Sequence, residues 1–172
     1  YVKNGVKRVK PITVFYCPTQ NNAKARAEEF IRFLINNEKI ENYSNLSDSE
    51  LDQKVRARVI CVVSKIAESE YKQQLDHIEE TDPSKVGGQV EFIFSVGKLL
   101  EGWDVDNVFQ IVPMEEKIFN SKLLISQVLG RGLRIPRCLN LIDISSTGSY
   151  PMLTVTNHEK FADQIKELVY AV

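Results

Sequence analysis

The sequence predicts an α/β domain in which a parallel β-sheet is covered by helices on both faces. Short apolar runs rich in β-branched and aromatic residues recur along the chain, as buried parallel strands require. Between them lie segments whose apolar residues are spaced by threes and fours, which is the pattern of amphipathic helices. Strands that alternate with helices of this length predict parallel pairing. The 172 residues and 43% hydrophobic content suit one globular domain, residues 1–172.

The first strand and helix are expected near the amino end. The run ITVFYC, residues 12–17, follows Pro11 and predicts a buried strand, which Pro18 and Thr19 end. Thr19 or Asn21 is suited to cap the helix that follows. The apolar face of that helix comprises Ala23, Ala27, Phe30, Ile31 and Leu34.

The middle of the chain is expected to supply two more strands and two helices. A polar stretch, residues 41–58, contains a short predicted helix from Asp48 to Arg56. The run RVICVV, residues 58–63, predicts a second strand, and residues 64–80 predict a helix with Tyr71, Leu75 and Ile78 on its inner face. The turn-rich stretch TDPSKVGGQ, residues 81–89, leads into a third strand, VEFIFSV, residues 90–96.

The remaining elements continue the alternation. The run VFQIVP, residues 108–113, predicts a fourth strand, and a helix is expected from about Asn120 to the glycines that precede Pro136. Two further strands are expected in LNLIDIS, residues 139–145, and in MLTVTN, residues 152–157. A terminal helix from Glu159 is expected to bury Phe161, Ile165, Leu168 and Val169.

Charge is nearly balanced, with a net formal charge of −1. A domain that binds nucleic acid by bulk electrostatics would show a clear positive excess, so any such contact must be local or shared with another domain. Basic residues cluster before the first strand, where a solvated lead-in segment is expected. These residues are Lys3, Lys7, Arg8 and Lys10.

Composition also bears on compartment and metal content. No apolar run approaches the roughly 20 residues that a membrane span requires, and the amino-terminal residues have no apolar signal core, so a cytoplasmic protein without membrane contact is expected. The 3 cysteines are far apart and form no C-x-x-C pair, which argues against a zinc site and for Cys17 and Cys61 as buried apolar residues. His77 is expected to face solvent or to bond to its own helix, so no metal site is predicted.

A short acidic turn precedes the fourth strand. Gly102 permits a sharp backbone path, and Asp104, two residues later, offers a carboxylate suited to sugar hydroxyls. After that strand, Gln127, Arg131 and Arg134 fall at i, i+4 and i+7, so they project from one face if the helix holds. Two guanidiniums on one edge suggest a binding site for an anion. Arginines in a terminal helical turn are, however, usually solvated surface charges.

These motifs resemble those of superfamily 2 helicases and translocases. The run QVLGRGLR resembles their motif VI, Q-x-x-G-R-x-x-R, and SVGKLLEGWDV resembles motif V, in the family's order and spacing. The sequence EGWD followed by NVFQIVP and GRGLRIP is most similar to the helicase part of type III restriction enzyme subunits. The resemblance covers essentially the whole chain and is strongest in motifs V and VI. It implies a RecA-like α/β fold, the second of two motor domains.

The resemblance implies a role for each residue at the nucleotide. Arg131 and Arg134 match the arginine fingers, whose fork-shaped donors face the charge that builds on the γ-phosphate of ATP. Gln127 would orient the attacking water or the γ-phosphate, and Asp104 would hold the ribose or an arginine nearby. Gly102 and Gly130 are expected in the same nucleotide-binding site.

The resemblance also implies contacts with the nucleic-acid backbone. Thr19 and Gln20 occupy the turn of motif IV, and in motif V the Ser95 hydroxyl with the turn at Gly97 and Lys98 would meet a phosphate. Position 96, where the family commonly has threonine, holds valine here. Turn residues of this kind also serve merely to cap a helix, so both interpretations of Thr19 and Gln20 stay open.

Two motifs that the chain lacks indicate its partners. No G-x-x-x-x-G-K-[ST] phosphate loop and no D-E-x-[HD] metal carboxylates occur, so ATP and Mg²⁺ are expected to be held mainly by an N-terminal RecA-like domain. Double-stranded DNA and a methyltransferase subunit are the further expected partners of a restriction endonuclease. The alternatives are a DNA or RNA helicase without a nuclease and a degenerate RecA-like docking module. A Rossmann domain is disfavoured because no G-x-G-x-x-G follows a predicted strand.

Overall fold

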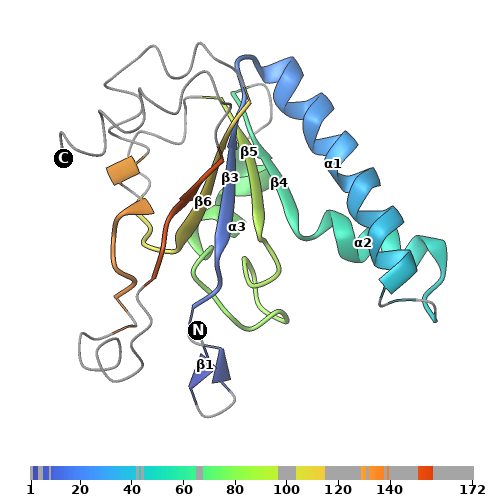
Figure 1. Ribbon diagram of the computed structural model, residues 1–172. Coiled ribbons are helices and arrows are strands. Elements are labelled where there is room, and N and C mark those ends of the chain that lie inside the picture. Colours follow the sequence, from blue (N-terminus) through green and yellow to red (C-terminus); the bar gives the residue numbers. More distant parts are fainter. Residues whose placement is uncertain are drawn as a thin grey trace.

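The computed structural model describes residues 2–3, 6–7, 9–41, 43, 45–64, 68–96, 104–114, 129–130, 132–137, 139 and 151–156. Within these residues a five-stranded sheet has the strand order β4-β5-β3-β6-β7, with every pair parallel. The strands are β3 (Ile12–Tyr16), β4 (Val59–Val62), β5 (Phe92–Ser95), β6 (Val108–Pro113) and β7 (Thr154–Val155). This is the predicted RecA-like α/β fold (Figure 1).

Helices cover both faces of the sheet. The helices α1 (Gln20–Glu41) and α2 (Asp48–Arg56) pack on one face, and α3 (Glu68–Asp76) packs on the other (Figure 1). The core under α1 and α2 contains Cys17, Ala23, Ala27, Ile31, Leu51, Val55, Val59, Val63 and Phe94. The core on the α3 side contains Ile12, Val14, Tyr16, Ile60, Val62, Tyr71, Ile78, Val90, Ile93, Val105, Val108, Ile111 and Leu129.

The period-2 alternation of β3 explains this division. Val14 pairs with Ile93 on one side and Ile111 on the other, and all three side chains belong to the core on the α3 side. Phe15 points to the opposite face, where its ring stacks on that of Phe94 at a centroid distance of 4.3 Å. The sheet is therefore buried on both faces at its centre, as the near-continuous apolar strands predicted.

Both described cysteines carry free thiols. Cys17 is buried, as predicted, whereas Cys61 is only partly buried. Burial, followed by the charge of the neighbouring Cys61 thiolate, raises the pKa of Cys17 to about 12. Because the thiolate is the reactive form, Cys17 is a packing residue and not a nucleophile.

Lys10 corrects the prediction of a solvated basic lead-in. Its side chain is only 2% exposed, and its Nζ donates a hydrogen bond to the carbonyl of Gly87. The Asn107 amide donates to the Lys10 carbonyl at 3.0 Å, which joins the entry to β3 with the entry to β6. Upstream, β1 (Val2–Lys3) and β2 (Val6–Lys7) pair antiparallel, a hairpin that the sequence did not indicate.

Several predicted boundaries are confirmed and others shift. The strand at residues 108–113 and the helix from Asp48 to Arg56 have the predicted bounds. The helix expected at residues 64–80 begins at Glu68, ends at Asp76 and continues as turns through residue 79. Of the helix expected from residue 120, the structure describes Leu129, Gly130 and residue 132, which are helical. Most of the expected strand at 139–145 and the expected terminal helix lie outside the described residues.

Candidate functional site

A cleft of about 450 Å³ lies where the segment before β6 meets the segment that follows the helical residues at 129–132. It is lined by Asp104, Asp106, Arg134, Ile135 and Arg137. Because β6 begins opposite the first residue of β3, with Ile12 paired to Val108, this cleft lies at the amino ends of the parallel strands. The lining residues pair two carboxylates with two guanidiniums, so their formal charges cancel.

Asp104 and Arg134, both predicted at the nucleotide, are brought together in this cleft. Arg134 Nη1 and Asp104 Oδ1 form an ion pair across 30 residues of sequence. The two side chains are 45% and 69% exposed, respectively, so the pair is open to solvent. Of the two partners expected for Asp104, a ribose or an arginine, the structure contains the arginine.

A second ion pair lies beside the first. Asp106 Oδ2 accepts hydrogen bonds from the Arg137 backbone N–H at 2.7 Å and from its Nε at 2.9 Å. The Asp106 backbone N–H in turn donates to Glu79 Oε1 at 3.1 Å, which connects the cleft to the end of the α3 segment. The hydrogen bond to Asp106, followed by the charge of Glu79, raises the pKa of the Arg137 guanidinium.

The sequence analysis missed Asp106, Arg137 and Glu79. A signal existed for the first of them, because Asp104 and Asp106 alternate around a buried valine just before a strand. Alternation of this kind predicts that both carboxylates lie on one side of the backbone. Nothing in the local pattern connects either residue with Glu79, which is 27 positions from Asp106.

Gly130, predicted at the nucleotide, is exposed. Its φ is not in the left-handed region, and a Cβ added to it would meet no atom of the described residues within 4 Å. Gly132 differs, because a Cβ there would come within 2.4 Å of the Leu153 side chain next to β7. Within the part of the chain that the structure describes, nothing fills the space in front of Gly130.

Thr19 and Gln20 lie at the opposite, carboxyl ends of the strands, where α1 begins (Figure 1). The Thr19 hydroxyl accepts a hydrogen bond from the Asn22 backbone N–H at 3.2 Å, and the Thr19 carbonyl accepts from Ala23 at 2.9 Å. Thr19 therefore caps α1, the first of the two expected candidates. The Gln20 amide donates to the Ser64 hydroxyl, which follows β4.

Ser95 differs from its expected role at a phosphate. Its side chain is fully buried, and its hydroxyl donates to the Val62 carbonyl on the neighbouring strand at 3.1 Å. A hydroxyl used in this way is not presented to a nucleic-acid backbone, so a phosphate at this edge would have to meet other groups. Gly97 and Lys98 lie outside the described residues, as do Gly102, Gln127 and Arg131.

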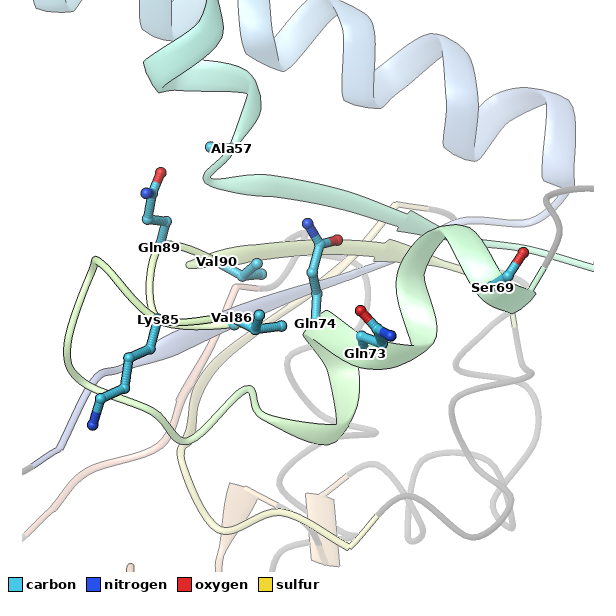
Figure 2. A pocket seen from close by; sticks show the side chains of 9 residues that line it. Ala57, Ser69, Gln73, Gln74, Lys85, Val86, Gln89 and Val90 are labelled. Atoms are coloured by element: carbon cyan, nitrogen blue, oxygen red, sulfur yellow. The ribbon is translucent and has the colours of Figure 1, made fainter.

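A second, more neutral hollow of about 300 Å³ lies between α3 and the turns that precede β5. Figure 2 shows the side chains of Gln73 and Gln74 on α3, with Lys85 directed away from them. Lys85 forms an ion pair with Glu80 at 3.4 Å, and His77 bonds to the Gln73 carbonyl of its own helix, as predicted. The described residues contain no group of three or more histidines, cysteines or carboxylates placed to hold a metal ion.

Comparison with known proteins gives no family assignment. No family model matches the chain, and no curated protein matches it either. Among the described residues, no helix combines the length and apolar character that a membrane span needs.

Proposed function

We propose that this chain is the second RecA-like domain of an ATP-dependent DNA translocase, in the helicase part of a type III restriction endonuclease subunit. The observation that supports the proposal most is the pairing of Arg134 with Asp104 in a solvent-filled cleft. These are the residues that the resemblance assigns to the nucleotide, and they lie 30 positions apart in the sequence.

The Arg134 guanidinium is placed to exchange partners. An exposed ion pair contributes only about 0–1 kcal/mol, because water competes for both charges. A phosphate group offers more charge and a bidentate geometry that matches the guanidinium fork. A nucleotide that enters the cleft would therefore displace Asp104 from Arg134 at little cost and leave the Asp104 carboxylate free to accept from the ribose.

In the proposed mechanism, ATP and Mg²⁺ are held mainly by an N-terminal RecA-like domain. Arg131 and Arg134 approach the γ-phosphate from the second domain, and Gln127 orients the attacking water or the γ-phosphate. In other nucleotide hydrolases an arginine finger accelerates hydrolysis by roughly 10³ to 10⁵. Hydrolysis then opens the cleft between domains, and the resulting movement shifts the protein along duplex DNA.

Arginine substitutions test the nucleotide site. In the full-length parent protein, Arg131→Ala and Arg134→Ala are each expected to lower DNA-stimulated ATP hydrolysis by about 10³-fold or more, because each removes a donor that stabilises transition-state charge. Arg26→Ala is the matched control, since Arg26 is an exposed α1 residue that pairs with Glu29 at 2.6 Å, far along the chain from the cleft. Its hydrolysis rate should stay within about twofold of the natural protein.

The outcomes separate the alternatives. Unchanged hydrolysis in variants that still fold would leave the arginines as surface charges and would favour a docking module without catalytic function. A loss of hydrolysis in a parent that never cuts DNA together with a methyltransferase subunit would favour a helicase without a nuclease.

A further inference from the structure

Two aspartates and two arginines form parallel pairs along the cleft. Asp104 and Asp106 are two residues apart before β6, and Arg134 and Arg137 are three residues apart on the facing segment. Asp104 pairs with Arg134, and Asp106 pairs with Arg137. The two segments are therefore joined at two adjacent points.

The two pairs differ sharply in burial. The Asp104 side chain is 69% exposed, whereas that of Asp106 is only 9% exposed. Asp106 accepts from both the backbone and the side chain of Arg137, and Arg137 Nη2 also lies 3.5 Å from Glu79 Oε1 and from the Asp104 carbonyl. Separating the buried Asp106 carboxylate from its two donors is costly, whereas separating the exposed pair of Asp104 and Arg134 costs little.

We infer that Asp106 is a positioning residue that fixes the segment 134–137 so that Arg134 faces the cleft, while Asp104 is the exchangeable partner of Arg134. The inference rests on the proposed function, because it assigns Arg134 to an anionic ligand. Asp106 acts through the Arg137 backbone N–H and does not touch that ligand. The neighbouring aspartates therefore have opposite effects on anion affinity. Asp104 competes with the anion for Arg134, whereas Asp106 holds Arg134 in position to bind the anion.

The experiment titrates the natural chain, Asp104→Asn and Asp106→Asn with inorganic tripolyphosphate while the arginine Nε–H signals are followed by NMR. At 19.6 kDa the chain suits this measurement. Asp104→Asn should tighten tripolyphosphate binding about two- to fivefold, because it removes a competing exposed carboxylate. Asp106→Asn should weaken binding by roughly three- to tenfold, because it removes a charge-assisted acceptor from the segment that carries Arg134.

Control variants separate positioning from general destabilisation. Asp52→Asn removes an exposed carboxylate that bonds to Arg56 Nε at 2.8 Å on α2, and it should leave tripolyphosphate affinity unchanged. Circular dichroism at the titration temperature confirms that each variant is folded.

Opposite signs for the two aspartates would support the inference. The inference would be overturned if Asp106→Asn and the natural chain bound tripolyphosphate equally while the Arg137 Nε–H signal shifted. Asp106 would then position Arg137 but not Arg134. If the natural chain binds no tripolyphosphate, the positioning role is still decided by the Arg134 Nε–H signal, and the proposed function is decided separately by ATP hydrolysis in the full-length parent. A shift of that signal in Asp106→Asn supports positioning, and an unchanged signal excludes it.

Discussion

Gly87 has a backbone conformation that favours glycine. Its φ of 77° lies in the left-handed region, and a Cβ at this position would lie 2.3 Å from the His77 carbonyl oxygen. Its own carbonyl accepts the hydrogen bond from buried Lys10, so a shift of the turn would break a hydrogen bond of a buried ammonium. Here glycine is required by the fold, which makes Gly87 a useful contrast to Gly130.

The two glycines are predicted to respond to alanine in opposite ways. Gly87→Ala should lower the free energy of unfolding by about 2–4 kcal/mol, because it adds backbone strain and a steric overlap. Gly130→Ala should raise it by up to about 1 kcal/mol, because alanine favours the helical conformation and meets no neighbour. Urea unfolding of the natural chain and both variants measures these differences.

Gly130→Ala should nevertheless impair ATP hydrolysis by the full-length parent. A glycine that lowers helix stability and serves no internal contact is explained if a nucleotide or a second domain approaches it closely. Undiminished hydrolysis in a variant of equal or greater stability would show that the open space at Gly130 serves neither. Impaired hydrolysis in such a variant would instead indicate that an external group contacts the chain at Gly130.

At the scale of elements, α2 begins at a capping box. The Ser47 hydroxyl accepts from the Glu50 backbone N–H at 3.3 Å, and the Glu50 carboxylate accepts from the Ser47 backbone N–H at 2.9 Å. The hydrogen bond with the Ser47 side chain, followed by that with the Ser47 backbone, lowers the pKa of the Glu50 carboxyl. The helix so started buries Leu51 and Val55 in the core beside β4.

Loss of this cap should destabilise the chain in a pH-dependent manner. Ser47→Ala is expected to lower the free energy of unfolding at pH 7 by about 1 kcal/mol. Because the pKa of Glu50 is lowered on folding, the contribution of its carboxylate is fully present above the ordinary pKa of about 4.5 and is lost as the pH falls below 4.5 and through the lowered pKa. The difference between Ser47→Ala and the natural chain should therefore shrink in acid.

Ser49→Ala, in the same first turn, is the control for α2. Ser49 is exposed and lies outside the capping box, so its replacement should change stability by less than about 0.5 kcal/mol. A Ser47→Ala effect that is equal at pH 7 and below pH 4 would contradict the linkage to Glu50.

The elements that sequence predicted best are those whose signals are local. The strand at residues 108–113 is a short apolar run with one polar residue, Gln110, and α2 has its cap and both core residues within nine positions. The helix α3 is shorter than its apolar periodicity suggested, because Ile78 packs in the core from a turn and not from the helix. Periodicity reports which residues are buried and only indirectly how the backbone holds them.

The residues of the candidate site were predicted where a sequence motif marked them, and missed where only the folded chain brings them together. The resemblance singled out Asp104 and Arg134, which the structure brings together. It did not indicate that Asp106 receives the Arg137 backbone N–H across 31 positions, or that Lys10 reaches Gly87 across 77. Both contacts depend on how separate segments cross at the amino ends of the strands, and no spacing in the sequence encodes that crossing.

At the scale of the whole molecule, the two candidate sites lie at opposite ends of one sheet. The cleft at Asp104 and Arg134 precedes β6, whereas Thr19 and Gln20 follow β3. A strand of five residues separates such ends by roughly 17 Å, so no ligand group spans the distance directly. The sheet between them is packed on both faces. If nucleic acid and ATP bind at these two ends, as proposed, we expect them to influence each other through movement of the whole domain.

This arrangement predicts that the two ends can be impaired separately. In the full-length parent, Gln20→Ala should reduce the stimulation of ATP hydrolysis by DNA severalfold while leaving hydrolysis without DNA intact, because only the nucleic-acid end is altered. Arg134→Ala should abolish both rates, since the proposed finger acts in every turnover. Steady-state hydrolysis measured with and without duplex DNA distinguishes the two patterns.

Ser64→Ala identifies the cause of a Gln20 effect. It removes the hydrogen bond between Gln20 and Ser64 but keeps the Gln20 amide available to a phosphate. If Gln20 contacts DNA, Ser64→Ala should retain DNA stimulation within about twofold, and Gln20→Ala should not. Equal losses in both variants would mean that the hydrogen bond merely holds the start of α1 against the end of β4. A loss of DNA-independent hydrolysis in Gln20→Ala would contradict the separation of the two ends, because a substitution at the carboxyl ends of the strands would then reach the nucleotide without DNA.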